Sequence, residues 1–389
     1  MLETLARRLA LPVNVKAEIV QPGTLNGRRP SVSVIIPCYN YGRYLPQCVD
    51  SVLSQQDVAA EIIIIDDAST DGSDAIVRQL AAGDPRVRAI CHTTNMGHIA
   101  TYNEGISQVS GDYTTLLSAD DLLTPGCLSR ATALMETYPS VGLVYGFPVD
   151  FTDSHLPPAR TTASSWIIWP GHDWLTYRCK VGQNIIRSPE VVLRTSVLHE
   201  TGGYKTHLPH AADFELWMRT ATVSDIGYVA GADQAYYRIH TSNMHQSMFD
   251  MLDDFSQRLA SFDTIFNERS ELLSDPIEMR DMAHRALARG ALSQAIRDTA
   301  HRAIGRSAMS RAVGASALVA VGEESVDGYT QFALKAWPDA RNLREWRTLN
   351  NLFPESGSLP KLSPALVASM AARKTRTRFR CWRKRVVGV

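Results

Sequence analysis

The sequence predicts a mixed α/β fold in which a mostly parallel central sheet is flanked by helices, with a helical extension after it. Three observations lead to this prediction. Short apolar runs typical of buried strands recur between residues 32 and 117. Stretches with apolar side chains at helical spacing separate these runs. The connections are short, so right-handed helical crossovers between parallel strands are the simplest topology.

Composition limits the class of protein. The chain has 389 residues, 44% of them hydrophobic, which suffices for one large domain and an extension. Lys and Arg balance Asp and Glu at 40 each, so no nucleic acid partner is expected. The six cysteines form no Cys-x-x-Cys pair, the start lacks a signal-peptide core, and no apolar run reaches the roughly 18–20 residues of a membrane span. We therefore expect a cytoplasmic protein, with any membrane contact peripheral.

The first two strands are predicted after a polar N-terminal arm or linker, residues 1–30. Val32 to Ile36 is a buried run that a loop and an amphipathic helix follow. Glu61 to Ile65 is one acid and four isoleucines, too uniformly apolar for a half-exposed strand. It therefore predicts a central parallel strand.

Two further strands complete the first half. A helix capped near Ser73 leads to Val87 to Cys91, the third predicted strand. A helical stripe then ends at Gly111, and Tyr113 to Leu117 forms the fourth.

The acid pair Asp120 and Asp121 follows this fourth strand directly. Adjacent carboxylates repel each other, so a cation or hydroxyl donors must compensate them, and Mg²⁺ and Mn²⁺ prefer such hard oxygen ligands. The alternative is that the acids simply open a helix at a strand–helix turn. After the pair, Thr124 is predicted as a helix cap and Pro125 as the first helical residue. Because ligands bind at the carboxyl ends of parallel strands, we expect loops 38–42, 66–73 and 118–122 to converge on one crevice.

Several short motifs occur in one order over residues 32–240 and together resemble the family 2 glycosyltransferases. The segments are 34–40, 64–73, 95–97, 103–105, 111–113 and 118–121. The resemblance implies the Rossmann-like GT-A fold and an inverting transfer of a sugar from a nucleotide diphosphate-sugar, with a UDP-sugar favoured. The acceptor implied is a hydroxyl of a glycan, a lipid-linked or another molecule, in cell-surface polysaccharide or glycoconjugate synthesis.

The same resemblance assigns the donor site. Pro37 shapes the base pocket, Tyr39 stacks on the base or lines its pocket, and Asp67 accepts a hydrogen bond from the base, most naturally from N3–H of uracil or thymine. The alternative for Tyr39 is a core aromatic at a strand end. Ser118 replaces the first acid of the family's Asp-x-Asp motif, which leaves the roles of the acid pair open. We assign Asp120 to the ribose, with or without metal contact, and Asp121 to Mn²⁺ or Mg²⁺.

The second half is expected to supply the general base. An inverting transfer needs a carboxylate that takes the proton of the acceptor hydroxyl. Where the family has Glu-Asp, this chain has Ala212 and Asp213, so Asp213 is predicted as the base, against the alternative of an ordinary helix-start acid. Glu215 is expected to point to solvent or to Arg219, one turn away.

Two histidines and three tryptophans carry weaker predictions. His240 ends a segment similar to the family's Tyr-Arg-x-His and is expected to complete the metal sphere or meet the diphosphate. His98 is expected to make a structural hydrogen bond rather than to bind phosphate. Three tryptophans are expected to close the core, with sugar contact as the alternative; they are Trp166, Trp169 and Trp174.

The predicted domains are the catalytic domain 31–245, divided into a nucleotide-binding half 31–125 and an acceptor half 126–245, a helical extension 246–348, and a linker with a basic tail 349–389. Segment 373–385 carries eight cations and no acid. Such a tail would be attracted to an anionic membrane leaflet by about 1 kcal/mol per cation near the surface. The alternative is a solvated tail.

Two other functions are alternatives to the glycosyltransferase. A sugar-phosphate nucleotidyltransferase would carry a glycine-rich phosphate loop near the first strand, and segment 37–40 has none. A non-catalytic nucleotide-sugar-binding or scaffold protein would tolerate Ser118 and Ala212. The retained acids favour the enzyme.

Overall fold

The computed structural model describes residues 16–25, 27–241, 250–309, 323–352 and 382–388. The chain divides into two compact units. Unit 1 comprises residues 1–175, 184–248 and 381–389, and unit 2 comprises residues 176–183 and 249–380. The predicted domain ranges stay predictions.

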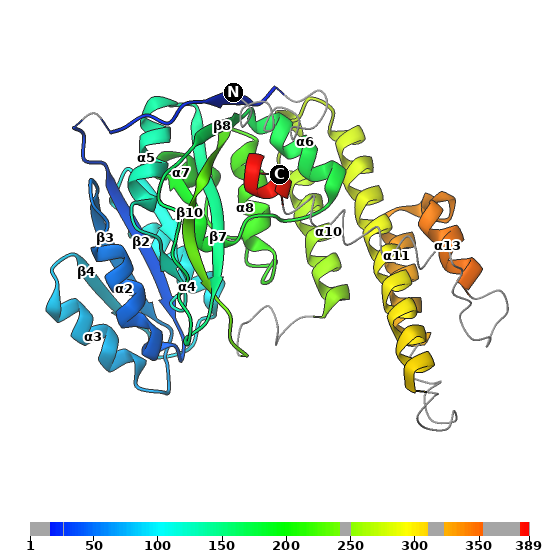
Figure 1. Ribbon diagram of the computed structural model, residues 1–389, viewed down its shortest axis with the longest axis horizontal. Coiled ribbons are helices and arrows are strands. Elements are labelled where there is room, and N and C mark those ends of the chain that lie inside the picture. The colour runs from blue at the N-terminus through cyan, green and yellow to red at the C-terminus, as the bar shows by residue number, and fades with distance from the viewer. Residues whose placement is uncertain (1–15, 26, 242–249, 310–322, 353–381, 389) are drawn as a thin grey trace. The chain divides into compact units, whose positions relative to one another are not determined.

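Unit 1 is built on a ten-stranded sheet (Figure 1). Its order is β1-β8-β10-β7-β9-β5-β2-β3-β4, and β6 pairs with β10. The strands are β1 (Glu18–Val20), β2 (Ser31–Cys38), β3 (Ala59–Asp66), β4 (Val87–Cys91), β5 (Tyr113–Leu116), β6 (Leu122–Leu123), β7 (Val141–Phe151), β8 (Ser165–Trp169), β9 (Val192–Arg194) and β10 (Asp225–Arg238).

The run β5-β2-β3-β4 is parallel, which confirms the predicted fold class. Residues 62–65, the four isoleucines, are fully buried in β3, as a strand covered on both faces requires. The helices that connect these strands are α2 (Leu45–Leu53), α3 (Ser73–Gly83) and α4 (His98–Ser107).

The other half of the sheet is mixed. Strand β9 runs antiparallel to both β5 and β7, whereas β7 and β10 are parallel to each other. The helices of this half are α5 (Cys127–Thr137), α6 (Gly171–Val181), α7 (Thr195–Thr201) and α8 (Ala212–Ala221), with the 3-10 turn η2 (Ser188–Glu190). A second 3-10 turn, η1 (Gly42–Tyr44), lies between β2 and α2 in the parallel half.

The predicted helix start after the acid pair is wrong. Residues 122–123 form the short strand β6, and α5 begins only at Cys127. Its cap is Gly126 at φ 72°, a left-handed conformation that glycine adopts without steric cost. Likewise, Gly72 at φ 87° rather than Ser73 caps α3.

Both ends of the described chain join unit 1. Strand β1, within the segment predicted as an arm, pairs with the edge strand β8. Residues 382–387 form a helical turn. Tyr145 Oη donates to the carbonyl of Gly388, and Trp169 Nε1 donates to the carbonyl of Val387 at 3.3 Å. The end of the predicted basic tail is therefore packed, while residues 353–381 lie outside the described residues.

Unit 2 is helical, as the predicted extension requires. It contains part of α6 together with α10 (Met251–Glu268), α11 (Pro276–Met309), α12 (Glu323–Ala336) and α13 (Arg344–Leu352), with η3 (Ser270–Leu272) and η5 (Pro338–Asn342). Phe255, Tyr329 and Phe332 form an aromatic cluster between α10 and α12. Of the helices described, none is long and apolar enough to cross a membrane.

Candidate active site at the carboxyl edge of the sheet

The loops after β2 and β3 lie together, as predicted. The backbone N–H of Asn40 donates to Ser69 Oγ at 2.9 Å, and that of Thr70 donates to Asn40 Oδ1 at 2.8 Å. The N–H of Asp67 donates to the carbonyl of Cys38 at 2.8 Å. These bonds fix Asp67 at the carboxyl edge of the parallel sheet.

Asp67 is held by three donors. Its Oδ1 accepts from the backbone N–H of Met96 at 2.7 Å and lies 2.7 Å from His92 Nδ1, and its Oδ2 accepts from the N–H of Gly97 at 2.8 Å. Burial alone raises the pKa of Asp67, but these hydrogen bonds outweigh it and hold the pKa below its ordinary value. The carboxylate is therefore ionised at neutral pH and acts as an acceptor.

Two exposed side chains belong to the segments whose backbone hydrogen-bonds to Asp67. Tyr39, one residue after β2, is 47% exposed, and Met96, whose N–H binds Asp67, is 59% exposed. The alternative that Tyr39 is a core aromatic is therefore wrong. Pro37 lies inside β2, opposite Ile65 of β3. Tyr39 follows Cys38, whose carbonyl accepts from the N–H of Asp67, and an exposed flat ring on this loop suits a heterocyclic base.

The acid pair has two different environments. Asp121 is 2% exposed, and its Oδ1 accepts from the backbone N–H of Arg238 at 2.9 Å. Burial and the charge of Asp120 raise the pKa of Asp121 well above its ordinary value. His240 Nε2 lies 3.0 Å from Asp120 Oδ2. The structure thus brings His240 to Asp120 rather than to Asp121.

The pair of Asp120 and His240 fits a divalent cation. An imidazole nitrogen and a carboxylate oxygen are both ligands for divalent metals, and here the two atoms lie at hydrogen-bond distance from each other. The rings of Tyr41 and Tyr44 pack against His240 at 5.6 and 5.4 Å between centroids and orient the imidazole. Within the described residues no group of three or more His, Cys, Asp or Glu side chains could hold a metal. Further ligands would have to come from a bound diphosphate and water, as is usual for Mg²⁺.

Asp213 lies in the first turn of α8. Its Oδ2 accepts from Asn184 Nδ2 at 3.1 Å, and its Oδ1 accepts from the N–H of Phe214 at 2.6 Å. Burial raises the pKa of Asp213 to about 6, although these hydrogen bonds act in the opposite direction. An exposed helix-start acid would not be raised, so the environment is that of a group able to take up a proton near neutral pH.

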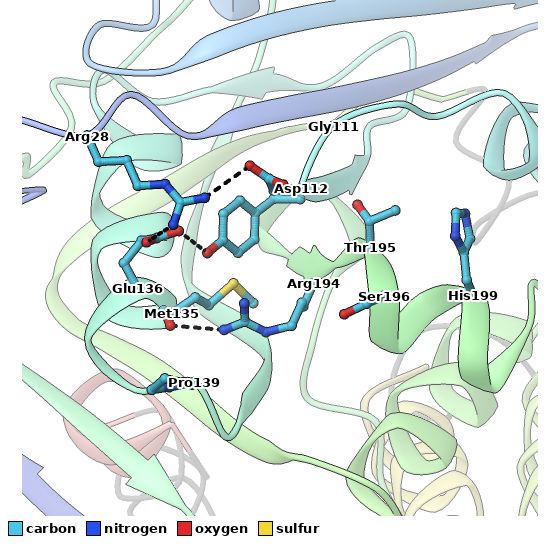
Figure 2. A pocket seen from close by; sticks show the side chains of 11 residues that line it. Arg28, Gly111, Asp112, Met135, Glu136, Pro139, Arg194, Thr195, Ser196 and His199 are labelled. Carbon is cyan, nitrogen blue, oxygen red and sulfur yellow. Dashed lines mark hydrogen bonds and ion pairs between the residues drawn. The ribbon is translucent and has the colours of Figure 1, made fainter.

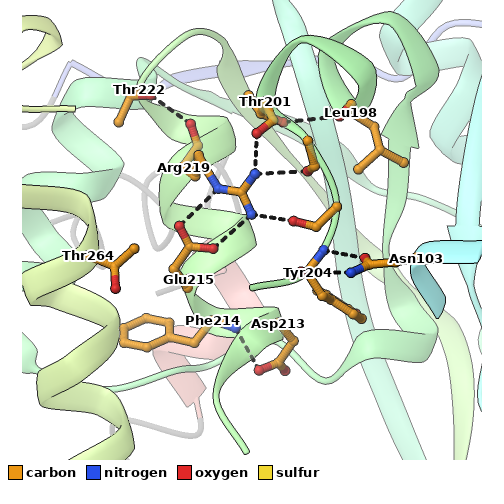
Figure 3. Close-up of polar contacts among 12 residues, drawn as sticks. Asn103, Leu198, Thr201, Tyr204, Asp213, Phe214, Glu215, Arg219, Thr222 and Thr264 are labelled. Carbon is orange, nitrogen blue, oxygen red and sulfur yellow. Dashed lines mark hydrogen bonds and ion pairs between the residues drawn. The ribbon is translucent and has the colours of Figure 1, made fainter. Parts of the chain in front are cut away.

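A buried ion pair anchors α8 (Figure 3). Glu215 is fully buried, and its two oxygens accept from Arg219 at 2.9 and 2.8 Å. Arg219 also donates to the carbonyl of Thr201, and to those of Gly202 and Gly203 at 2.9 and 2.7 Å. The predicted partner Arg219 is confirmed and the solvent alternative for Glu215 is wrong. All five guanidinium N–H groups are used, which fixes α8 against the end of α7 and the loop that follows it.

Helix α4 connects the two sides of the site. Asn103 exchanges two hydrogen bonds with the backbone of Tyr204, at 2.7 and 2.8 Å (Figure 3). His98 Nε2 lies 2.8 Å from the carbonyl of Pro209, in the loop before α8, so it has the predicted structural hydrogen bond. The three tryptophans at 166, 169 and 174 are almost fully buried and close the core.

Two contributors were not predicted from the sequence. His92 directly follows β4, just as Asp67 directly follows β3. This position after a strand end was the sequence signal that could have identified His92. Arg238 is the second contributor, and its guanidinium pairs with the loop carboxylate of Asp153. Its backbone binds Asp121 and its Nε donates to the carbonyl of Asp120 at 2.7 Å, so it holds the whole acid pair.

A second pocket, of about 540 Å³, lies at the opposite edge of the sheet (Figure 2). It opens beside Tyr113, the first residue of β5, whereas the acid pair follows the last. Arg28 pairs there with Glu136 at 2.6 Å and with Asp112 at 3.4 Å. Because these charges neutralise one another, the pocket has no strong preference for a charged ligand.

Comparison with known proteins identifies the family and the fold. The family described as glycosyl transferase family 2 matches residues 33–192. An uncharacterized glycosyltransferase of Nostoc sp. is 30% identical over 231 residues, which are 56% of this chain and 67% of that protein. A chondroitin synthase of Pasteurella multocida is 24% identical over 64% of this chain, but the chain spans only 28% of that synthase.

Two solved structures share the fold. The complex of Staphylococcus aureus TarS with UDP-GlcNAc has a TM-score of 0.53 at 17% identity and covers 80% of both chains. The mannosyltransferase PcManGT from Pyrobaculum calidifontis, in complex with GDP-Man and Mn²⁺, has a TM-score of 0.55 at 17% identity and covers 99% of this chain and 90% of that one. The fold is therefore that of the GT-A glycosyltransferases. The chain belongs to glycosyltransferase family 2 and is a transferase, which favours the enzyme over the non-catalytic alternative.

Proposed function

We propose that this enzyme transfers a sugar from a nucleotide diphosphate-sugar, with a UDP-sugar favoured, to an acceptor hydroxyl with inversion at the anomeric carbon. The observation that carries the proposal is the contrast in one unit between a hydrogen-bonded acceptor carboxylate, Asp67, and a carboxylate of raised pKa, Asp213. The donors named for the neighbours, UDP-GlcNAc and GDP-Man, support this donor class.

In this proposal the donor base binds at Asp67. Its carboxylate accepts a base N–H, Tyr39 stacks on the ring, and Pro37 shapes the loop that presents Tyr39. The exposed ring of Tyr39 supports this role, because stacking on a base would cover it.

Asp120 and His240 would hold Mn²⁺ or Mg²⁺ in this scheme. We assign Asp121 a supporting role instead of the expected metal contact, because its Oδ1 already accepts from the backbone N–H of Arg238. The cation would neutralise charge on the departing diphosphate. The neighbour solved with Mn²⁺ supports a divalent cation. The ribose contact assigned to Asp120 stays a proposal.

Asp213 would be the general base. As the acceptor oxygen bonds to the anomeric carbon, the bond from that carbon to the diphosphate oxygen breaks, and its electron pair leaves with the nucleotide. The proton of the acceptor hydroxyl moves to Asp213. A base with a pKa of about 6 is still ionised at neutral pH yet more basic than an ordinary aspartate.

The acceptor class and location are proposals from the same resemblance. A glycan or lipid-linked acceptor in polysaccharide synthesis is supported by relatives named chondroitin synthase and hyaluronan synthase. We further propose a cytoplasmic enzyme that contacts anionic membrane through segment 373–385. Of that segment, only 382–385 lies within the described residues.

Calorimetric titration of UDP, with and without Mn²⁺, tests the donor site. We expect wild type and Asp213→Asn to bind UDP with Mn²⁺, and Asp120→Asn to lose the Mn²⁺ dependence. Release of UDP from a panel of UDP-sugars, with water or added glycans as acceptors, tests catalysis. Equal turnover by wild type and Asp213→Asn would contradict the base assignment, and absence of nucleotide binding by wild type would overturn the proposed function.

A further inference from the structure

His92 lies between two carboxylates at the end of β4. Its Nδ1 is 2.7 Å from Asp67 Oδ1, and its Nε2 is 2.6 Å from Glu104 Oε2 on α4. Ionised carboxylates only accept hydrogen bonds, so both ring nitrogens must carry protons for both contacts to be favourable. The arrangement therefore stabilises an imidazolium with two charge-assisted hydrogen bonds.

The surroundings agree with this charge state. Burial lowers the pKa of His92, but the hydrogen bonds and charges of Asp67 and Glu104 outweigh it and raise the pKa above its ordinary value. The charged groups of α3 nearest to this strand end, Arg78 and Asp74, act on the preceding residue, Cys91. Asp67 and Glu104 are thus the partners that determine the protonation of His92.

The lone-pair positions of Asp67 that remain free determine how many hydrogen bonds a base can donate to it. A carboxylate offers about four lone-pair positions. Met96 N–H and His92 fill both on Oδ1, and Gly97 N–H fills one on Oδ2. One position remains. Uracil and thymine present one imide N–H between two carbonyls, whereas guanine presents two parallel donors that pair best with both oxygens of a carboxylate.

We infer that His92 is a positioning residue that sets base selectivity, because by filling Oδ1 of Asp67 it restricts the site to a base with a single imide N–H, uracil or thymine, and disfavours guanine. This inference rests on the proposed function, since it takes Asp67 as the acceptor for the donor base. It goes beyond that function by naming the residue that selects the base.

Titration of UDP and GDP in the presence of Mn²⁺ tests the inference. We expect wild type to prefer UDP by about tenfold, the equivalent of one hydrogen bond. In His92→Leu, Oδ1 is freed and the preference should fall to about twofold or less. In His92→Asn, the side-chain amide can donate from near the position of Nδ1, so the preference should be retained. His199→Asn, an exposed histidine beside the second pocket, is the matched control and should behave as wild type.

The pH dependence of the UDP preference distinguishes this role from a purely structural one, which would not change the preference with pH. Above the raised pKa of His92 the neutral ring carries one proton for two carboxylates, so the UDP preference of wild type should weaken as pH rises. In Glu104→Gln, the glutamine amide can donate to Nε2, which keeps the proton on Nδ1. That variant should keep its preference across the same pH range.

An unchanged UDP to GDP ratio in folded His92→Leu, while wild type binds UDP, would overturn this inference alone. If His92→Leu does not fold, Glu104→Gln decides, and a pH dependence equal to that of wild type would overturn it. A wild type that binds neither nucleotide would overturn the proposed function as well.

Discussion

The carboxylates of Asp67 and Asp213 lie in contrasting environments. Asp67 receives three hydrogen bonds and has a lowered pKa, whereas burial dominates at Asp213 and raises its pKa to about 6. A carboxylate that stays ionised suits recognition of a ligand N–H, and one that titrates near neutral pH suits proton transfer. This contrast is what the proposed division of roles requires, with Asp67 binding the donor and Asp213 taking up the proton.

The largest expected effect is on turnover. Asp213→Asn should lower kcat by about 10²- to 10⁴-fold, the usual contribution of a general base, and leave UDP affinity unchanged. The measurement is UDP release from the best donor of the panel. Asp74→Asn is the matched control, because Asp74 is also a first-turn acid but is half exposed on α3. A similar loss in both variants would contradict the assignment.

The next effect is on stability. Glu215→Leu leaves Arg219 charged and buried, so the free energy of unfolding should fall by about 3–5 kcal/mol. The double variant Glu215→Leu with Arg219→Met should regain only part of this loss, because it removes the unpaired charge but also the hydrogen bonds to the carbonyls of Thr201, Gly202 and Gly203. Urea denaturation measures both. The exposed pair of Asp74 and Arg78, with the same spacing, is the control, and its loss should change stability by less than about 0.5 kcal/mol. An equal loss at both pairs would contradict the role of burial.

The pH profile should show the titration of Asp213. The carboxylate must be ionised to take a proton, so kcat/KM should rise with pH through about 6 and then level off. At pH 5 the value should be about one tenth of the plateau. A profile that stays flat between pH 5 and 7 would mean that another group is the base.

The smallest expected effect is at Asp67. Asp67→Asn keeps one acceptor oxygen but loses the charge, so the KM for the donor should rise about fivefold to tenfold with kcat little changed. Donor saturation curves measure this. A fall in kcat without a change in KM would reverse the roles assigned to the two carboxylates.

The parallel half of the fold could be predicted from the sequence because its signals are local. The isoleucine run in β3 and the acids after β3 and β5 each lie within a few residues of a strand end, and parallel strands bring such positions to one edge. The positions of Asp67 and Asp120 at this edge could therefore be predicted from the strands, whereas Asp213, at a helix start, could be predicted only from its resemblance to the family's Glu-Asp motif.

The rest depends on contacts between distant residues. The pairing of His240 with Asp120 joins residues 120 positions apart, and no spacing rule fixes which acid of the pair it meets. The link from His92 to Glu104 needs the packing of α4 on β2 and β3, which brings Glu104 to the end of β4. The start of α5 was misplaced because the backbone conformation of Gly126 outweighed the cap signal of Thr124 and Pro125.

A crystal structure with UDP and Mn²⁺, with anomalous diffraction to locate the metal, tests the central claim most directly. The account predicts an anomalous peak within bonding distance of Asp120 and His240, the diphosphate beside it, and the uracil N3–H on Asp67. A metal bound elsewhere, or a uracil ring away from Asp67 and Tyr39, would contradict it.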